Sequence, residues 1–158
     1  MVIDPELFKS LFASWVSGVT IVTSRDGERV QGMTASAFTE VSLDPPLVLI
    51  CADKATITNE LIEASGAFSV SILAEGQEAL STRFASKKDE HRRFEGLDCE
   101  TGATGCARIP EALAWIDCDV VQTLDAGDHY VYIGEIRAAD VSDRAPLLYF
   151  RGSYGKLA

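Results

Sequence analysis

The spacing of apolar residues predicts a helix near the start of the chain. Five large apolar side chains recur at helical intervals and form one broad face: Leu7, Phe8, Leu11, Phe12 and Trp15. Asp4 suits the capping position of such a helix, and Pro5 fits its first turn. We therefore expect a helix over residues 4–15 that ends before Gly18.

The later apolar segments are rich in β-branched residues or alternate with polar ones, which is typical of strands. The predicted strands cover residues 19–23, 30–41, 47–52, 67–73, 115–124, 129–141 and 147–151. Two further helices are expected, over 58–66 with Thr58 as the cap and Gly66 as the stop, and over 77–84. Residues 86–113 are polar and glycine-containing, and a loop of that length in a compact domain is usually functional.

The order of these elements predicts a mainly β fold with peripheral helices. Consecutive strands are joined by hairpin-type turns such as Asp26-Gly27, and helices do not alternate with strands. The pattern favours an antiparallel β-barrel over a Rossmann sheet, and neither a Gly-x-Gly-x-x-Gly fingerprint nor a Walker loop occurs. We expect residues 1–158 to form a single domain.

Composition narrows the choice of partners and compartment. With 14 Lys plus Arg against 24 Asp plus Glu, the net charge is −10, which argues against nucleic acid as a partner. No apolar run approaches the length of a membrane span, and the first residues lack a secretory signal, so a cytoplasmic protein is expected. The four cysteines form no Cys-x-x-Cys and lack usual ligand spacing to histidine, which predicts free thiols and no metal site.

Residues 32–38 (GMTASAF) are the first candidate for binding chemistry. On a strand, Thr34, Ser36 and Phe38 face one way, while Ala35 and Ala37 face the other. Small residues let a flat ring approach the backbone, whose N–H and C=O groups can then bond the edge of that ring. The alternative is a plain strand that packs beneath a helix.

Two segments could bind an anion. Lys54, Thr56 and Thr58 lie at a predicted helix start, where free N–H groups favour phosphate, although a simple cap with a solvated lysine is the alternative. Five of the 14 basic residues lie between positions 83 and 93, namely Arg83, Lys87, Lys88, Arg92 and Arg93. This run suits a pyrophosphate or other anion, or forms a solvated face paired with Asp89 and Glu90.

His129 follows Gly127-Asp128 at a predicted hairpin tip. A histidine there can face a ligand or satisfy the turn, and no serine or cysteine stands at a spacing that would suggest a hydrolase triad.

Taken in order, these segments resemble the flavin reductase family, which has the FMN-binding split-barrel fold and supplies the reductase component of two-component flavin-dependent monooxygenases. The resemblance runs from about Phe12 to Tyr154. It rests on residues 17–23 (SGVTIVT), 32–38 (GMTASAF), 42–48 (SLDPPLV), 54–58 (KATIT), 127–129 (GDH), 134–136 (GEI) and 146–154 (PLLYFRGSY). Each motif alone is weak, but their common order is specific.

The resemblance implies an NAD(P)H:flavin oxidoreductase that passes a hydride from NADH or NADPH to FMN or FAD and serves a partner oxygenase. It also implies a homodimer with one flavin per subunit near the interface. By position, Met33, Thr34, Ala35 and Ser36 would meet the flavin ring, and Cys51, Ala52 and Asp53 would border the ring and ribityl chain. The phosphate would lie against Lys54, Thr56 and Thr58, with Arg83 and Phe84 near the flavin. His129 and Tyr154 would lie on the nicotinamide side, and His129, the candidate catalytic residue, would position the nicotinamide rather than donate a proton.

Three other functions stay open at this point. A flavoprotein could retain FMN and reduce another bound acceptor, such as a corrinoid or a metal complex. A non-catalytic flavin- or haem-binding module is a second possibility. A relative of pyridoxamine-phosphate oxidase is the third, and it would need a more basic phosphate site than Lys54 with two threonines.

Overall fold

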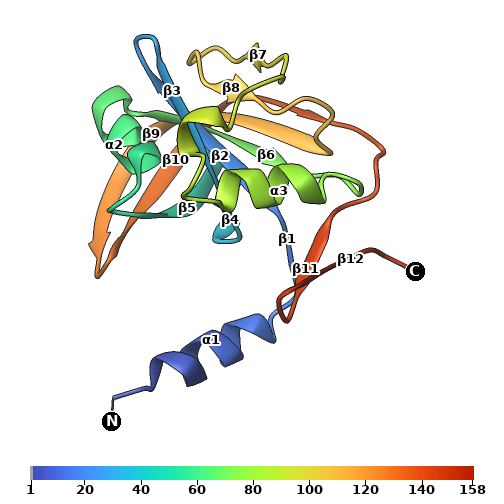
Figure 1. The fold of residues 1–158 in the computed structure, drawn as a ribbon. Helices are drawn as coiled ribbons and strands as arrows, with labels where there is room; N and C mark the ends of the chain where they lie inside the picture. Colours follow the sequence, from blue (N-terminus) through green and yellow to red (C-terminus); the bar gives the residue numbers. More distant parts are fainter. Residues whose placement is uncertain (1) are drawn as a thin grey trace.

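The computed structural model describes residues 2–158 and centres on one seven-stranded sheet in which every neighbouring pair is antiparallel (Figure 1). The strand order is β3-β2-β6-β9-β10-β5-β4. The strands are β2 (Thr20–Asp26), β3 (Arg29–Ala35), β4 (Phe38–Ser42), β5 (Leu47–Asp53), β6 (Ala67–Ile72), β9 (Ala114–Ala126) and β10 (His129–Val141). The predicted mainly β, antiparallel class is confirmed.

The single strand predicted over 30–41 was wrong. It is two strands, β3 and β4, which lie at opposite edges of the sheet and are separated only by Ser36 and Ala37. The break occurs where the N–H of Phe38 turns back to the carbonyl of Ser36, at 3.0 Å, and leaves the ladder. The two sheet edges therefore meet at this corner, yet no ladder joins β3 to β4, and the sheet stays open.

The main core fills the inner face of this sheet. Its largest fully buried side chains include Phe68, Ile50 and Tyr132, and Gly134 leaves room for the Phe68 ring. Helix α2 (Ile57–Ser65) covers one end of the core and ends at Gly66, which adopts the left-handed conformation, φ 68°. The predicted cap Thr58 was wrong: Thr56 caps the helix, and Thr58 is fully buried within the first turn.

A second apolar cluster lies beneath α3 (Glu78–Ala85), whose Phe84 is fully buried in it. The following segment is less irregular than its composition predicts. It contains the 3-10 turn η1 (Glu90–Arg92) and the short pair β7 (Glu100–Thr101) and β8 (Ala107–Arg108). Buried Asp117 anchors it, accepting hydrogen bonds from the Thr104 hydroxyl at 2.6 Å and the Thr104 N–H at 2.9 Å.

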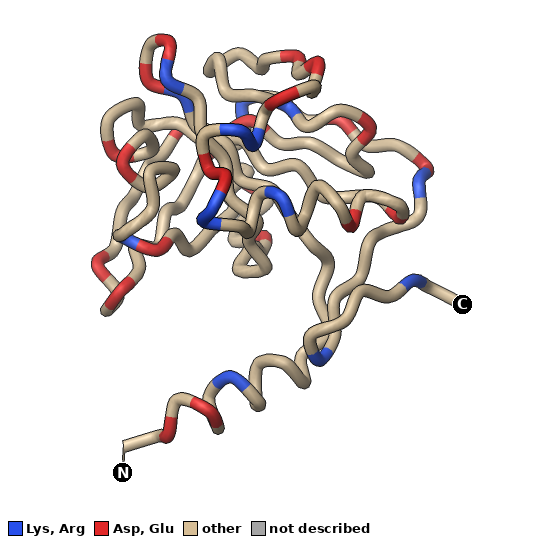
Figure 2. Tube along the Cα trace, viewed as in Figure 1, with Lys and Arg blue, Asp and Glu red and all other residues tan. Residues whose placement is uncertain are grey.

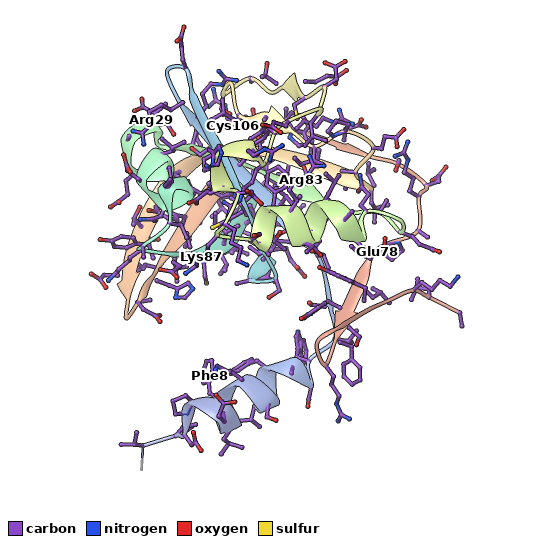
Figure 3. All side chains as sticks on the ribbon, viewed as in Figure 1. Phe8, Arg29, Glu78, Arg83, Lys87 and Cys106 are labelled. Carbon is purple, nitrogen blue, oxygen red and sulfur yellow. The ribbon has the colours of Figure 1, made fainter. Side chains whose placement is uncertain are left out.

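The two ends of the described chain build an arm outside the main sheet (Figure 1). Helix α1 (Pro5–Ala13) leads into β1 (Ser17–Gly18), which forms a separate sheet with β11 (Leu148–Phe150) and β12 (Ser153–Gly155). Asp4 caps α1 as predicted, and the helix ends two residues before Trp15. No residue of α1 is buried, and Figure 3 shows Phe8 standing clear of the sheet. Within residues 2–158, none of the helices has the length and apolar composition of a membrane span.

Candidate functional site

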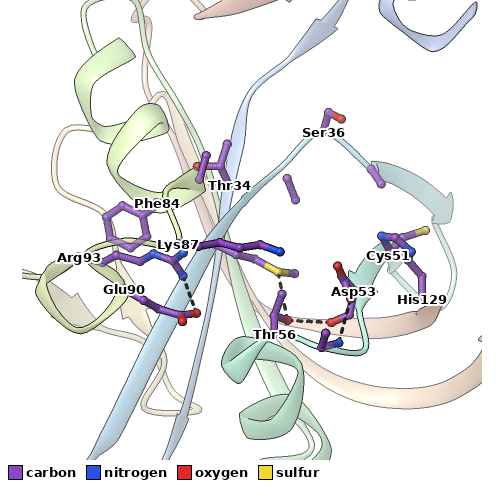
Figure 4. A pocket seen from close by; sticks show the side chains of 15 residues that line it. Thr34, Ser36, Cys51, Asp53, Thr56, Phe84, Lys87, Glu90, Arg93 and His129 are labelled. Carbon is purple, nitrogen blue, oxygen red and sulfur yellow. Dashed lines mark hydrogen bonds and ion pairs between the residues drawn. The ribbon is translucent and has the colours of Figure 1, made fainter. Parts of the chain in front are cut away.

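A cavity of about 420 Å³ lies where the β3–β4 corner, the end of β5 and the end of α3 converge (Figure 4). The β3–β4 corner contributes small, uncharged side chains, and the segment after α3 contributes Lys87, Glu90 and Arg93. Nine of the sequence-predicted site residues line it: Met33, Thr34, Ala35, Ser36, Cys51, Asp53, Thr56, Phe84 and His129. The structure thus brings together segments that lie up to 96 positions apart, from Met33 to His129.

The β3 side of the cavity fits a flat heteroaromatic group. Strand β3 is an edge strand, so the backbone N–H and C=O groups on the side away from β2 have no partner strand. Side chains already bond both groups of Gly32, the N–H through Gln31 and the carbonyl through Arg93, which leaves the residues after Gly32 to meet a ligand. Ala35 and Ala37 keep side-chain bulk low along this wall. Thr34 is fixed in place because its hydroxyl donates to the carbonyl of Ser81 on α3, at 2.5 Å. A ring could therefore approach the backbone and exchange hydrogen bonds along its edge.

The turn from β5 into α2 forms the floor of the cavity. The Asp53 carboxylate accepts the Ala55 N–H at 2.8 Å, and the Asp53 carbonyl accepts the Thr56 hydroxyl, also at 2.8 Å. The same Thr56 oxygen accepts the Asn59 N–H at 3.2 Å as the helix cap. The hydroxyl proton of Thr56 is thus already engaged, while the helix start faces the cavity with its positive dipole end.

Three predicted residues of this region point away from the cavity wall. Ala52 and Thr58 are fully buried in the interior. The ammonium group of Lys54 lies 2.7 Å from both the Asp125 carboxylate and the Gly127 carbonyl, and 4.8 Å from the centre of the Tyr130 ring. The hydrogen bond to Asp125 raises the pKa of Lys54.

Two more predicted residues lie beside the cavity rather than on it. Arg83 donates to the backbone carbonyls of Arg93 and Glu95, at 3.4 and 3.0 Å. Tyr154 lines a neighbouring cavity of about 220 Å³ that shares the Thr34–Ser36 wall, and its hydroxyl donates to the Ser81 hydroxyl at 2.8 Å. This second cavity lies on the α3 and β12 side of the same strand.

His129 enters the cavity from the hairpin tip between β9 and β10 (Figure 4). It pairs across the ladder with Asp53, which brings the tip to the end of β5. Its Nδ1 lies 2.7 Å from the Asp128 carboxylate, and this hydrogen bond lowers the pKa of Asp128. Within residues 2–158 the other ring nitrogen, Nε2, makes no hydrogen bond, so it is free to face a bound molecule.

Six lining residues were not among the predicted site residues: Ala37, Ala55, Ala85, Lys87, Glu90 and Arg93. The basic run at 83–93 was the only feature of the sequence that pointed to Lys87, Glu90 and Arg93. Figure 2 shows the basic positions of this run gathered along the segment that leaves α3. Arg93 is almost wholly buried, and burial lowers its pKa while Glu90, 3.2 Å away, opposes that shift. Spacing alone could not show which of the five basic side chains reach the cavity.

The cysteines are all free thiols in the structure. Cys106 and Cys118 are fully buried, whereas Cys51 is half-buried on the cavity wall. Burial raises the pKa of Cys51, and it raises the pKa of Cys118 to about 12.

The chain is similar in sequence and in fold to proteins of one known family. Residues 12–158 match the family model described as "Flavin reductase like domain". The chain is 39% identical over 158 residues to a flavin reductase of Pseudomonas putida, covering 99% of this chain and 92% of that protein. It is 39% identical over 153 residues to the reductase component of 4-hydroxyphenylacetate 3-monooxygenase of Thermus thermophilus, covering 96% of each. Among solved structures it is similar to the NADH:FAD oxidoreductase SgcE6 of Streptomyces globisporus C-1027, with TM-score 0.92, 33% identity and coverage of 100% and 98%.

Proposed function

This chain belongs to the flavin reductase-like family, and from that premise we propose that it is an NAD(P)H-dependent flavin reductase that supplies reduced flavin to a partner monooxygenase. The observation that carries the proposal is the cavity itself, where the free edge of β3 faces a helix start across a space of about 420 Å³. That volume lies within the range of small-molecule sites, roughly 300–1,000 Å³.

The residues of the chain would bind and orient the reactants rather than exchange protons with them. The free edge of β3 would hold the flavin ring, Cys51 and Asp53 would border its side chain, and the start of α2 at Thr56 would favour its phosphate. When bound, the flavin supplies the hydride-accepting chemistry. His129 would help to hold the nicotinamide in contact with the ring, which is an orientation effect.

Several finer features belong to the same proposal. The open sheet, whose edges meet at Ser36 and Ala37, is compatible with a split barrel. The exposed face of α1 supports a homodimer. Residues 1–158 would act as one domain. Tyr154 would border the nicotinamide from the neighbouring cavity. The four free thiols suit a reducing cytoplasm.

The test is NADH and NADPH oxidation by the purified protein with FMN, FAD and riboflavin in turn. We expect turnover that requires added flavin, a purified protein without yellow colour, and preference among the flavins that identifies the natural one. Turnover of a bound yellow flavin with a different acceptor would instead favour a flavoprotein that retains FMN. Absence of NAD(P)H oxidation with every flavin would contradict the proposal.

A further inference from the structure

The cation predicted to contact the flavin phosphate is committed elsewhere in the structure. The ammonium of Lys54 is 2.7 Å from both the Asp125 carboxylate and the Gly127 carbonyl, and Lys54 does not line the cavity. Drawing it into the cavity would break this ion pair with Asp125 at the end of β9. The hydroxyl of Thr58 is buried, and that of Thr56 already donates its proton to Asp53. The start of α2 therefore offers an anion its backbone N–H groups but no cationic side chain, and a cation must come from another element.

Lys87 is the cavity-lining cation with a free charge. Arg93 also lines the cavity, but its guanidinium is bonded to the carbonyls of Gly32 and Ser86 and to the Glu90 carboxylate. The Lys87 ammonium has no hydrogen bond or ion pair to any part of the chain between residues 2 and 158. Figure 4 shows its side chain extending into the cavity from the side of Phe84 and Arg93.

Arg93 holds the backbone that carries Lys87. One guanidinium nitrogen donates to the Ser86 carbonyl at 2.7 Å, immediately before Lys87, and another donates to the Gly32 carbonyl on β3, also at 2.7 Å. This bridge fastens the segment after α3 to the edge strand that forms the cavity wall. Since the guanidinium is only 4% exposed, the bridge is rigid, and lysine could not reproduce its fork.

We propose that Lys87, positioned by Arg93, contacts a phosphate group of the nucleotide bound in the cavity. The inference rests on the proposed function and names the group that recognises the anionic end of the ligand. The ammonium reaches in from the α3 side, while the positive end of α2 faces the cavity from its floor. Asp53 and Glu90 also line the cavity, but their carboxylates accept hydrogen bonds from the Ala55 N–H and from Arg93. Lys87 and the start of α2 therefore remain as the groups that attract an anion in this acidic chain.

The test compares Lys87→Ala with Lys88→Ala, a matched control that removes the same charge from the adjacent exposed residue outside the cavity. Affinities for FMN and for riboflavin, which has no phosphate, are measured by flavin fluorescence titration. The KM for NADH is measured with riboflavin as the acceptor. Loss of a charge-assisted hydrogen bond at a partly exposed site should weaken FMN about tenfold in Lys87→Ala, with riboflavin within about twofold. Lys88→Ala should match the unmodified protein, and Lys87→Arg should retain most of the FMN affinity.

The same measurements identify the source of the phosphate. If FMN and riboflavin affinities hold but Lys87→Ala raises the KM for NADH, the proposal stands and the phosphate belongs to the dinucleotide. Positioning by Arg93 predicts that Arg93→Lys lowers the FMN-to-riboflavin affinity ratio, and that it does not lower this ratio further when Lys87 is already alanine. Equal behaviour of Lys87→Ala and Lys88→Ala towards both FMN and NADH would overturn the assignment. If the unmodified protein reduces flavin in that case, only the role of Lys87 fails. If the unmodified protein is inactive, the proposed function itself is refuted.

Discussion

At the scale of single residues, hydrogen bonds at the hairpin tip fix the orientation of the His129 ring. Its Nδ1 is engaged by Asp128, so the face it offers to the cavity is Nε2. The backbone of Asp128 also holds the hairpin tip in place, because its carbonyl accepts the Lys54 N–H at 3.0 Å. The hairpin tip is thereby fastened to the end of β5, and the imidazole has a defined approach to the cavity.

His129→Ala should impair use of NADH while leaving flavin binding intact. The KM for NADH should rise or the turnover should fall, by roughly 10-fold for a lost positioning contact. Flavin affinity should stay within about twofold, because the proposed flavin contacts lie on other strands. The variant should also raise the pKa of Asp128 towards its ordinary value, since the hydrogen bond and charge that lower it are gone.

Steady-state kinetics, flavin titration and a carboxyl NMR titration check these outcomes on the folded variant. Unchanged NADH kinetics together with a raised pKa of Asp128 would restrict His129 to a structural role in the turn.

The thiols give an independent test of the cavity. Cys118, with a pKa of about 12 and full burial, should resist alkylation at pH 8 in the folded protein. Cys51 is half-buried on the cavity wall, so it should react slowly and become slower still when FMN is added. Cys99, also half-buried but outside the cavity lining, is the internal reference. Peptide mapping by mass spectrometry reads all these sites, and equal FMN effects on Cys51 and Cys99 would contradict the site.

At the scale of elements, β10 packs closely against Phe68 because position 134 has no side chain. A Cβ added to Gly134 would stand 2.5 Å from the Phe68 ring and 2.8 Å from the Cβ of Cys118. A register shift in the β9–β10 ladder occurs at the same point, between Ile133 and Gly134. Phe68 is fully buried, so its ring has little space into which it can move.

Gly134→Ala should therefore lower the free energy of unfolding by about 1–3 kcal/mol, the usual cost of overpacking a core. Gly155→Ala is the control, because its added Cβ would meet nothing closer than Leu148 at 4.0 Å, and it should change stability by less than about 0.5 kcal/mol. Urea denaturation measures both. Combining Gly134→Ala with Phe68→Leu should recover part of the loss, and equal stabilities of the two alanine variants would argue against this fit.

Element types were predictable from sequence because apolar spacing and turn residues are local properties. The helix starting at Pro5, the hairpin around Gly27 and the long hairpin of β9 and β10 follow from such signals. The break at Ser36 did not, because a strand that changes sheet edges keeps its local propensity and differs only in its partners. Cap position was likewise ambiguous, since Thr56 and Thr58 are both good caps and tertiary burial decided between them.

The sequence motifs predicted those parts of the candidate site that the backbone itself forms. Segments at β3, β5 and the hairpin tip reach the cavity, because their backbones form its walls. Side-chain direction was not predictable: Lys54 turns to Asp125 while Lys87 turns inward, and no local pattern distinguishes two lysines in loops. Long-range partners decide such choices, and a single sequence does not display them.

At the scale of the whole molecule, the dominant feature is the uncovered apolar face of α1. Leu7, Phe8 and Leu11 are each more than half exposed, as are Phe12 and Trp15. A contiguous apolar surface of this kind is uncommon on a soluble monomer and marks an interaction surface. A cavity of about 640 Å³ between α1 and the β4–β5 edge adjoins the corner at Ser36 and Ala37.

A homodimer that covers this face should dissociate in Phe12→Glu. Removing a buried phenylalanine contact costs at least about 2 kcal/mol, and a carboxylate in its place adds to this. The dimer Kd should rise by thirtyfold or more, which corresponds to that energy. Ser10→Glu places the same charge on the same helix outside the apolar set and should leave the dimer intact. Light scattering across micromolar concentrations distinguishes the two, and a monomeric unmodified protein would refute the dimer.

The separate sheet of the arm also has a consequence for biosynthesis. Gly18 pairs with Leu148, and the N–H of Arg151 donates to the carbonyl of Ala13 at 2.9 Å, so early and late segments complete each other. On a ribosome, α1 emerges long before its partners exist, with its apolar face open to chaperones or to neighbouring nascent chains. The β2–β3 hairpin needs no such delay, because its strands are consecutive. The arm can therefore assemble only after translation has passed residue 155.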